Sequence, residues 1–338
     1  MKKLLLILLC LPLIGFGQIP GCTDSLALNF NPNATIDDGS CLYSGCTDST
    51  ACNYNPLATI NDSSCLIGNC VENITQNTFT EDIQSGIDAA TNGDTLIMNS
   101  GTYVENVLIN SSSIVLASKY LTTSDSTYID ATIIDANNTG SAIEIDNSSL
   151  NISLTGFIMK NGYSSTTNTN GSGLYITNAN SVNLDRISII SSVAQYGGGI
   201  CWFTVNNGTL IVKSSFIDNN SATGGGGIYL EGVDRFEIYN SIISNNVVSS
   251  DGGGISTRSD TSIIVNSTIV SNEAGAGRYG SGIWLGGTNF SHHVLINSIF
   301  FGNYRYGDSY QNNIALASGS LYAHNNFTGI AFGFSLLE

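Results

Sequence analysis

The sequence predicts an all-β protein whose main part is a solenoid with a period of about 27 residues per coil. Glycine-rich steps run into an aliphatic residue at five evenly spaced positions: Leu174, Ile200, Ile228, Ile255 and Ile283. A second pattern keeps nearly the same period, because short apolar runs end in the asparagines Asn219, Asn245, Asn272 and Asn303. The segments between the glycines are short and rich in β-branched residues, so each coil is built of strands.

The composition fits this architecture and narrows the range of partners. Only 11% of the 338 residues are charged, 37 are glycine, and the formal net charge is -16. The turns of a β-solenoid need small polar residues, which this chain has in abundance. A strongly acidic chain is a poor ligand for nucleic acids and anionic membranes, since both require a basic face. The composition instead fits a secreted protein that meets neutral glycans or divalent cations.

Residues 1–18 are typical of a signal peptide. Two lysines are followed by an apolar run from Leu4 to Phe16 and by small residues. This run is shorter than the roughly 20 residues that a membrane span needs, and no other segment is long enough. We therefore expect secretion or display at the cell surface, with no transmembrane span. The alternative is a lipoprotein anchored through Cys22, although Pro20 fits a lipidation box poorly.

Residues 21–44 and 45–70 form two modules that are copies of one short unit. Each copy begins with Gly-Cys-Thr-Asp-Ser, and the spacing from Cys22 to Cys41 equals that from Cys46 to Cys65. A unit this small cannot bury a core, so it needs a covalent staple. We expect the disulfides Cys22–Cys41 and Cys46–Cys65, each worth about 3 kcal/mol for a loop of this size. Cys52 and Cys70 remain and can pair with each other, whereas zinc suits neither the spacing nor an exported protein.

The two modules resemble the GCTD…DDGSC modules found on large secreted surface proteins of flavobacteria. The first copy ends in Asp37-Asp38-Gly39-Ser40-Cys41, and the second has Asn61-Asp62-Ser63 in place of Asp-Asp-Gly. The resemblance implies a surface or spacer module without catalytic activity.

The same turns are candidate calcium sites. Their carboxylate oxygens are the ligands that Ca²⁺ prefers, and they come from Asp37, Asp38 and Asp62, together with Asp24 and Asp48. Aspartate is also an ordinary turn residue that hydrogen-bonds its own backbone. The sequence leaves both interpretations open.

Residues 78–338 are predicted to form the solenoid, with a short helix at its start. Ile83, Ile87 and Ala90 share one helical face, so this helix can cover the open end, with Thr80 as its N-cap. The strand-turn-strand run from Gly93 to Val107 is similar to the first coil of pectin-lyase-fold proteins. That resemblance implies a right-handed parallel β-helix, here with roughly eight or nine coils.

A second resemblance covers residues 170 to 305. Phe-x-x-Asn occurs at Phe216 and Phe300, and it alternates with a glycine pair followed by an aliphatic residue. This alternation resembles the repeats of chlamydial polymorphic membrane proteins, which are surface adhesins, although those proteins carry alanine after the glycine pair. The resemblance implies adhesion to a host or neighbouring surface.

Strand alternation predicts which side chains point inward. We expect Phe216, Ile242, Ile269 and Phe300 to enter the core just before each asparagine. The asparagines should then stack at one turn and hydrogen-bond along the solenoid, as a structural ladder rather than a ligand site. The predicted members of this ladder are Asn161, Asn219, Asn245, Asn272 and Asn303.

The strand after each glycine pair presents an outward row that holds Tyr175, Cys201, Tyr229, Ser256 and Trp284. Aromatic rings on alternate coils would lie about 10 Å apart, with Glu231 and Arg258 beside them. This arrangement predicts a glycan-binding strip in which sugar rings stack on Tyr175, Tyr229 and Trp284. The alternative is that aromatic residues merely favour strands and that the charged pair is a weak surface contact.

Catalysis is the rival interpretation. A lyase needs a basic residue beside a carboxylate cluster, and a hydrolase needs two carboxylates about the scissile bond. Lys213 and Arg235 lie one coil apart without such a cluster, and His292-His293 is expected in a loop between coils. We therefore predict a non-catalytic glycan-binding or adhesion protein that uses no cofactor, with calcium as the alternative that the module turns leave open. The alternatives are a polysaccharide lyase or glycoside hydrolase of the pectin-lyase fold, and a structural spacer.

Overall fold

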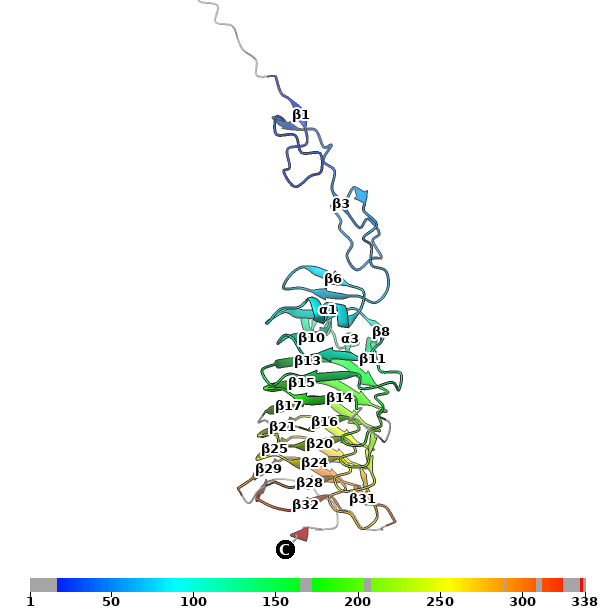
Figure 1. The fold of residues 1–338 in the computed structure, drawn as a ribbon, viewed down its shortest axis with the longest axis vertical. Helices are drawn as coiled ribbons and strands as arrows, with labels where there is room; N and C mark the ends of the chain where they lie inside the picture. Colours follow the sequence, from blue (N-terminus) through cyan, green and yellow to red (C-terminus); the bar gives the residue numbers. More distant parts are fainter. Residues whose placement is uncertain are drawn as a thin grey trace, which may run out of the picture. The chain divides into compact units, whose positions relative to one another are not determined.

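The computed structural model describes residues 17–164, 172–203, 208–287, 290–307, 312–324 and 335–336. The chain divides into two compact units, Met1–Ile67 and Gly68–Glu338. Residues 1–16 of the expected signal peptide lie outside the described residues. Figure 1 shows the elements of both units.

The first unit consists of the two modules, each closed by a pair of two-residue parallel strands. These strands are β1 Pro20–Gly21, β2 Ile36–Asp37, β3 Ser44–Gly45 and β4 Ile60–Asn61. The disulfides Cys22–Cys41 and Cys46–Cys65 are confirmed, and both have a Cα–Cα distance of 4.8 Å. Cys52 and Cys70 are disulfide-bonded as well.

In each module, one asparagine side chain makes the same pair of hydrogen bonds to the backbone near the second cysteine of the module's own disulfide. The Asn29 side chain donates to the Ser40 carbonyl at 2.6 Å and accepts from the Leu42 amide at 2.8 Å. Asn53 does the same with Ser64 and Leu66, at 2.6 and 2.9 Å. Since Leu26 is 85% exposed, the modules rely on disulfides and such side-chain clamps in place of a core.

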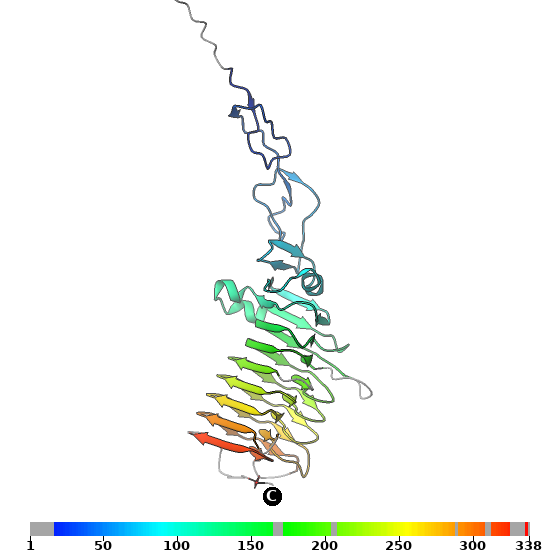
Figure 2. The same cartoon turned by 60° about the vertical axis from the view of Figure 1, so that its left-hand side comes forward.

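The second unit is a parallel β-helix of about seven turns with about 28 residues per turn, which confirms the predicted fold class. Its coils stack along one axis (Figures 1 and 2), and the strands of successive coils pair in parallel. The turns number fewer than the eight or nine expected. Residues 71–80 form a hairpin before the first coil, and residues 120–131 lengthen one coil by two short helices inserted between its strands.

Each full coil contains four short strands. The first two columns form the long sheet, in which β13 and β15 span both columns. The first column holds β7 Thr95–Met98, β10 Val115–Ser118, β13 Asn151–Lys160, β15 Ser181–Ile190, β17 Thr209–Lys213, β21 Arg235–Tyr239, β25 Thr261–Val265, β29 His292–Ile296 and β33 Ser320–His324. The second adds β8 Gly101–Val104, β11 Thr132–Asp135, β18 Phe216–Asp218, β22 Ile242–Ser244, β26 Thr268–Val270 and β30 Ile299–Phe301.

The other two columns form separate sheets. The third column is short and holds β19 Ser221–Ala222, β23 Val247–Val248, β27 Glu273–Ala274 and β31 Tyr304–Arg305. The fourth follows the glycines and holds β9 Val107–Ile109, β12 Ile143–Asp146, β14 Leu174–Asn178, β16 Ile200–Phe203, β20 Ile228–Glu231, β24 Ile255–Arg258, β28 Ile283–Leu285, β32 Ile314–Leu316 and β34 Ser335–Leu336.

The start of the β-helix is covered by a hairpin and a helix. Strands β5 (Val71–Asn73) and β6 (Thr78–Thr80) pair antiparallel, and β5 adds to β7. Helix α1 (Ile83–Ala89) buries Ile83 and Ile87, as expected. Its N-cap is Asp82 and not Thr80, because the Asp82 carboxylate accepts from the Ser85 amide at 2.6 Å.

Two further short helices, α2 (Tyr120–Thr123) and α3 (Thr127–Ala131), connect β10 to β11. Figure 2 shows this helical segment at the side of the stack. The guanidinium carbon of Arg186 lies 5.0 Å from the centre of the Tyr120 ring, a cation–π contact that fixes α2 against β15.

In the coils from β17 to β30, a residue with left-handed backbone joins the first-column strand to the second-column strand. This bend makes part of the predicted core wrong. Ser214, Asn240, Asn266 and Asn297 have φ values of 50–51°. This bend shifts the alternation by one residue, so Ile217 and Ile243 enter the core while Phe216 and Ile242 are 37% and 43% exposed. The inward positions of Ile269 and Phe300 are confirmed.

The asparagine ladder exists, but three of its predicted members are wrong. Asn219 and Asn245 are exposed left-handed residues, with φ of 54° and 52°. In these two coils the buried ladder residue is the next one, Asn220 or Asn246. The ladder runs through Asn220, Asn246, Asn272, Asn303 and Asn313, whose side chains bond to one another at 2.8–3.0 Å. Asn161 has the same left-handed backbone (φ 57°) and lies outside the buried ladder, whereas Asn272 and Asn303 are confirmed.

A second ladder of serines lies at the bend between the first two columns. The backbone amides of Ser215, Ser241 and Ser267 donate to the hydroxyl of the next serine at 3.1–3.3 Å, and the row ends on Ser298. Each hydroxyl also donates to the carbonyl two residues before it. The two ladders satisfy buried backbone groups where the strands change direction, which a solenoid without them would leave unpaired.

The repeated glycines are required by close contact between coils. A methyl group at Gly227 would lie 2.5 Å from the carbonyl oxygen of Gly254, and one at Gly254 would lie 2.5 Å from that of Gly282. No side chain fits at this separation, so the glycine repeat marks the turn where successive coils approach most closely.

Candidate functional site

The fourth column places the predicted outward row in the expected register. Tyr175 of β14 pairs with Cys201 of β16, which pairs with Tyr229 of β20. Ser256 of β24 and Trp284 of β28 continue the row. In the neighbouring row, Phe203, Glu231 and Arg258 lie opposite one another on β16, β20 and β24.

The row does not form a strip of bare rings. Cys201 is fully buried and Tyr229 is only 7% exposed, while Tyr175 and Trp284 are half-buried. The turn before β16 covers this part of the row, because the ring of its Tyr196 lies 4.9 Å from that of Tyr229, at an interplanar angle of 37°. Tyr229 therefore serves as a wall rather than as a flat platform.

A groove of about 470 Å³ lies over β16, β20, β24 and β28. It is lined by Tyr196, Phe203, Gly224, Tyr229, Glu231, Ser250, Asp251, Ser256, Arg258 and Trp284. Four of the five predicted glycan-binding residues line it, and Tyr175 does not. Tyr196 and Asp251 could not be predicted from the sequence. Both lie in turns, whose residues do not follow the strand alternation on which the prediction of the row was based.

The centre of the groove is a connected polar network. The Tyr229 hydroxyl donates to Glu231 Oε2 at 2.5 Å, and Arg258 Nη1 reaches the same oxygen at 3.1 Å. Arg258 Nη1 also lies 3.2 Å from the Tyr229 hydroxyl oxygen. The Arg258 guanidinium carbon lies 5.2 Å from the centre of the Trp284 ring, so one cation joins a carboxylate, a phenol and an indole.

Burial keeps two acidic groups of this region protonated. Burial, followed by the hydrogen bond to Glu231, raises the pKa of Tyr229 well above its ordinary value. Burial, followed by the charge of Glu231, also raises the pKa of the Cys201 thiol. Cys201 is a free cysteine, and neither it nor Tyr229 supplies an anion or a nucleophile near neutral pH.

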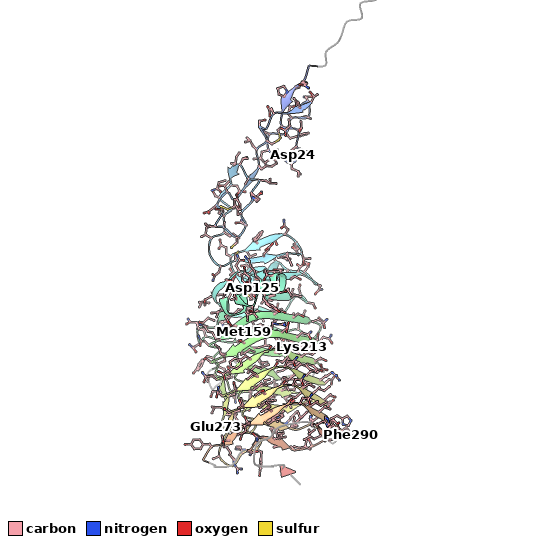
Figure 3. All side chains as sticks on the ribbon, turned by 180° about the vertical axis from the view of Figure 1, so that it is seen from behind. Asp24, Asp125, Met159, Lys213, Glu273 and Phe290 are labelled. Atoms are coloured by element: carbon pink, nitrogen blue, oxygen red, sulfur yellow. A yellow bond between two sulfur atoms is a disulfide. The ribbon has the colours of Figure 1, made fainter. Side chains whose placement is uncertain are left out.

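The residues weighed for lyase chemistry lie on the long sheet, away from this groove's strands. Lys213, labelled in Figure 3, is exposed and lies opposite Tyr239, whereas Arg235 lies opposite Thr209. The Arg235 side chain is paired with Glu237, which also accepts from the Tyr239 hydroxyl at 2.9 Å. Arg235 and Lys213 therefore occupy different rows, and the carboxylate between those rows is already engaged.

The aspartates of the modules serve their own turns. Asp38 and Asp62 accept from the amides of Ser40 and Ser64 at 3.0 Å, and Asp37 accepts from the Gly39 amide at 3.0 Å. Hydrogen bonding to the Ser40 and Ser64 side chains, followed by these bonds to their backbone amides, lowers the pKa of Asp38 and Asp62. Asp24 and Asp48 accept from backbone amides of their own turns as well. Within the described part of the chain, no three His, Cys, Asp or Glu side chains gather closely enough to hold a metal ion.

No protein-family model matches the chain, and no curated protein matches its sequence. Among the described residues, no helix is long and apolar enough to cross a bilayer.

Proposed function

We propose that the protein is a secreted or cell-surface β-helix protein that binds glycans through the groove of the fourth column and thereby adheres to a surface, without catalysing a reaction. Its partner is then an extracellular polysaccharide or the surface of a host or neighbouring cell. The observation that carries the proposal is the groove itself, in which aromatic rings flank a polar centre. This combination suits a sugar, whose ring has apolar faces and a hydroxylated rim.

Other features support this function. The apolar leader and the disulfides fit an oxidising, extracellular setting. The resemblance of the modules to those of secreted flavobacterial proteins, and of the later coils to surface adhesins, supports a place at the cell surface. The pectin-lyase-like start of the β-helix supports the right-handed form of the solenoid.

Replacement of Trp284 tests the proposal directly. Trp284→Ala should weaken glycan binding by about 1–3 kcal/mol, the scale of losing one aromatic anchor, and should leave the circular dichroism spectrum unchanged because the ring is half-buried at the groove and not in the core. Binding is measured by titration of the secreted protein against the best ligand from a glycan array.

The matched control is Phe216→Ala, which removes an exposed ring from β18 on the long sheet. It should leave binding unchanged. Equal binding by wild type and Trp284→Ala, or an equal loss in Phe216→Ala, would contradict the proposed site.

A further inference from the structure

The charges in the groove indicate which glycans fit it. We infer that the ligand is an uncharged glycan chain that lies along the solenoid axis, and this inference rests on the glycan-binding function proposed above. The charged side chains that line the groove are Glu231, Asp251 and Arg258. Two carboxylates against one guanidinium leave the groove with one negative charge.

Arg258, the basic side chain that lines the groove, is already engaged by neighbouring side chains. Arg258 is paired with Glu231 at 3.1 Å and stacked on Trp284, so it has little capacity to neutralise an incoming acid. Tyr229 and Cys201 stay neutral, and the whole chain carries a formal net charge of -16. A carboxylated or sulfated chain would meet repulsion both at the groove and at long range.

The unused hydrogen-bonding atoms are acceptors, which match hydroxyl groups. Glu231 receives its two hydrogen bonds on Oε2, and no donor among the described residues reaches its Oε1. Asp251 accepts from the Tyr279 amide through Oδ1 at 2.6 Å, and its Oδ2 is likewise without a donor in the described part of the chain. Two carboxylate oxygens are therefore left to accept from sugar hydroxyls, in strong charge-assisted bonds.

The positions of the exposed rings give the direction of the chain. Phe203, which is 47% exposed, stands on β16 at one end of the groove, and Trp284 stands on β28 at the other. The strands β16, β20, β24 and β28 are successive neighbours, so these ends lie about 14 Å apart along the axis. An extended oligosaccharide that crosses the coils contacts both rings and passes the two open carboxylate oxygens between them.

The test compares matched neutral and acidic oligosaccharides. The secreted full chain is titrated at low salt and at about 0.15 M salt with neutral glucan, mannan and xylan oligosaccharides and with uronate oligosaccharides of the same length. We expect the best neutral chain to bind at least about tenfold more tightly than any uronate. The double variant Glu231→Gln, Asp251→Asn keeps amide acceptors at both positions and changes the charge of the groove from one negative to one positive. Its preference for neutral over uronate chains should fall by at least about tenfold.

The outcomes separate the two proposals. Uronates that bind the wild type as tightly as neutral chains, or a preference that is unchanged in the double variant, would overturn the inference and leave glycan binding intact. Absence of binding to every chain would overturn the proposed function and the inference together.

Discussion

Asn246→Ala should lower the free energy of unfolding by about 3–5 kcal/mol. Asn246 is fully buried, and its side chain bonds to the coil before it and to the coil after it. Its amide donates to Asn272 and to the Ile217 carbonyl, and its oxygen accepts from the backbone and side chain of Asn220, all at 3.0 Å. Alanine would leave these partners unsatisfied. Asn246→Asp should cost more, because it places an unpaired charge at the same site.

The neighbouring residue is the control for this experiment. Asn245 is exposed and has a φ of 52°, which glycine adopts without strain. Asn245→Gly should therefore change the stability by less than about 1 kcal/mol. Denaturant melts of the two variants measure both effects. A similar loss in Asn245→Gly and Asn246→Ala would show that the buried ladder is assigned to the wrong residue.

A second large effect should appear between pH 6.5 and pH 4. His293 is 1% exposed, and neither of its ring nitrogens makes a hydrogen bond of normal geometry to a described residue. Burial, and then the charge of His292, lower the pKa of His293 from its ordinary value of 6.5 to about 4, although the Ser318 and Gly286 carbonyls oppose this in part. The unfolded chain thus takes up a proton on this ring at a higher pH than the folded chain does.

The sign of the pH dependence follows from this difference. Above pH 6.5 the His293 ring is neutral in both states and does not lower the free energy of unfolding. As the pH falls from 6.5 toward 4, the free energy of unfolding decreases by about 3 kcal/mol in total. His293→Leu should remove that slope, since Ser262 and Leu321, the partners of His293 on the adjacent strands, carry no charge. His292→Gln should keep most of it. Melts in urea at several pH values give the result, and an unchanged slope in His293→Leu would assign the acid sensitivity to other groups.

The period of the repeat and the register of the fourth column could be predicted because the glycine pairs fix them. A close approach between coils tolerates no side chain at Gly227 or Gly254, so the glycines recur in step with the coils. The disulfides could be predicted for a similar reason, since each small module has to close with the two cysteines of its own repeat. These features depend on local steric requirements that the sequence records directly.

The position of the asparagine ladder was ambiguous because two coils contain adjacent asparagines. Asn219-Asn220 and Asn245-Asn246 each offer two candidates, and the first of each pair gives an uneven spacing to Asn272. The residue just before each buried asparagine shows which of the two belongs to the ladder, because its backbone is left-handed. Asn219, Asn245, Ser271 and Gly302 all have φ between 52° and 63°. Asn, Ser and Gly are residues that tolerate this left-handed conformation, so the buried asparagine is the one that follows them.

Side chains placed by turns or by interior polarity gave no periodic signal. Tyr196 covers Tyr229 from a turn, which made a groove out of the predicted row of exposed rings. His293 lies in β29 with its side chain inward, opposite the buried Ser262, although a pair of polar residues indicates a loop. Tertiary contacts decide both positions, and such contacts are not recorded in local sequence.

The two tryptophans of the chain permit the most direct test of the glycan-binding groove. Trp202 is fully buried in the core, whereas Trp284 is half-buried in the groove beside Arg258. Titration of the secreted protein with neutral oligosaccharides should change the intrinsic fluorescence of Trp284 and protect it from a soluble quencher, and the response should disappear in Trp284→Phe. A neutral glycan that binds the protein without changing the fluorescence or the quenching of Trp284 would contradict the account, because it would place the binding site elsewhere on the molecule.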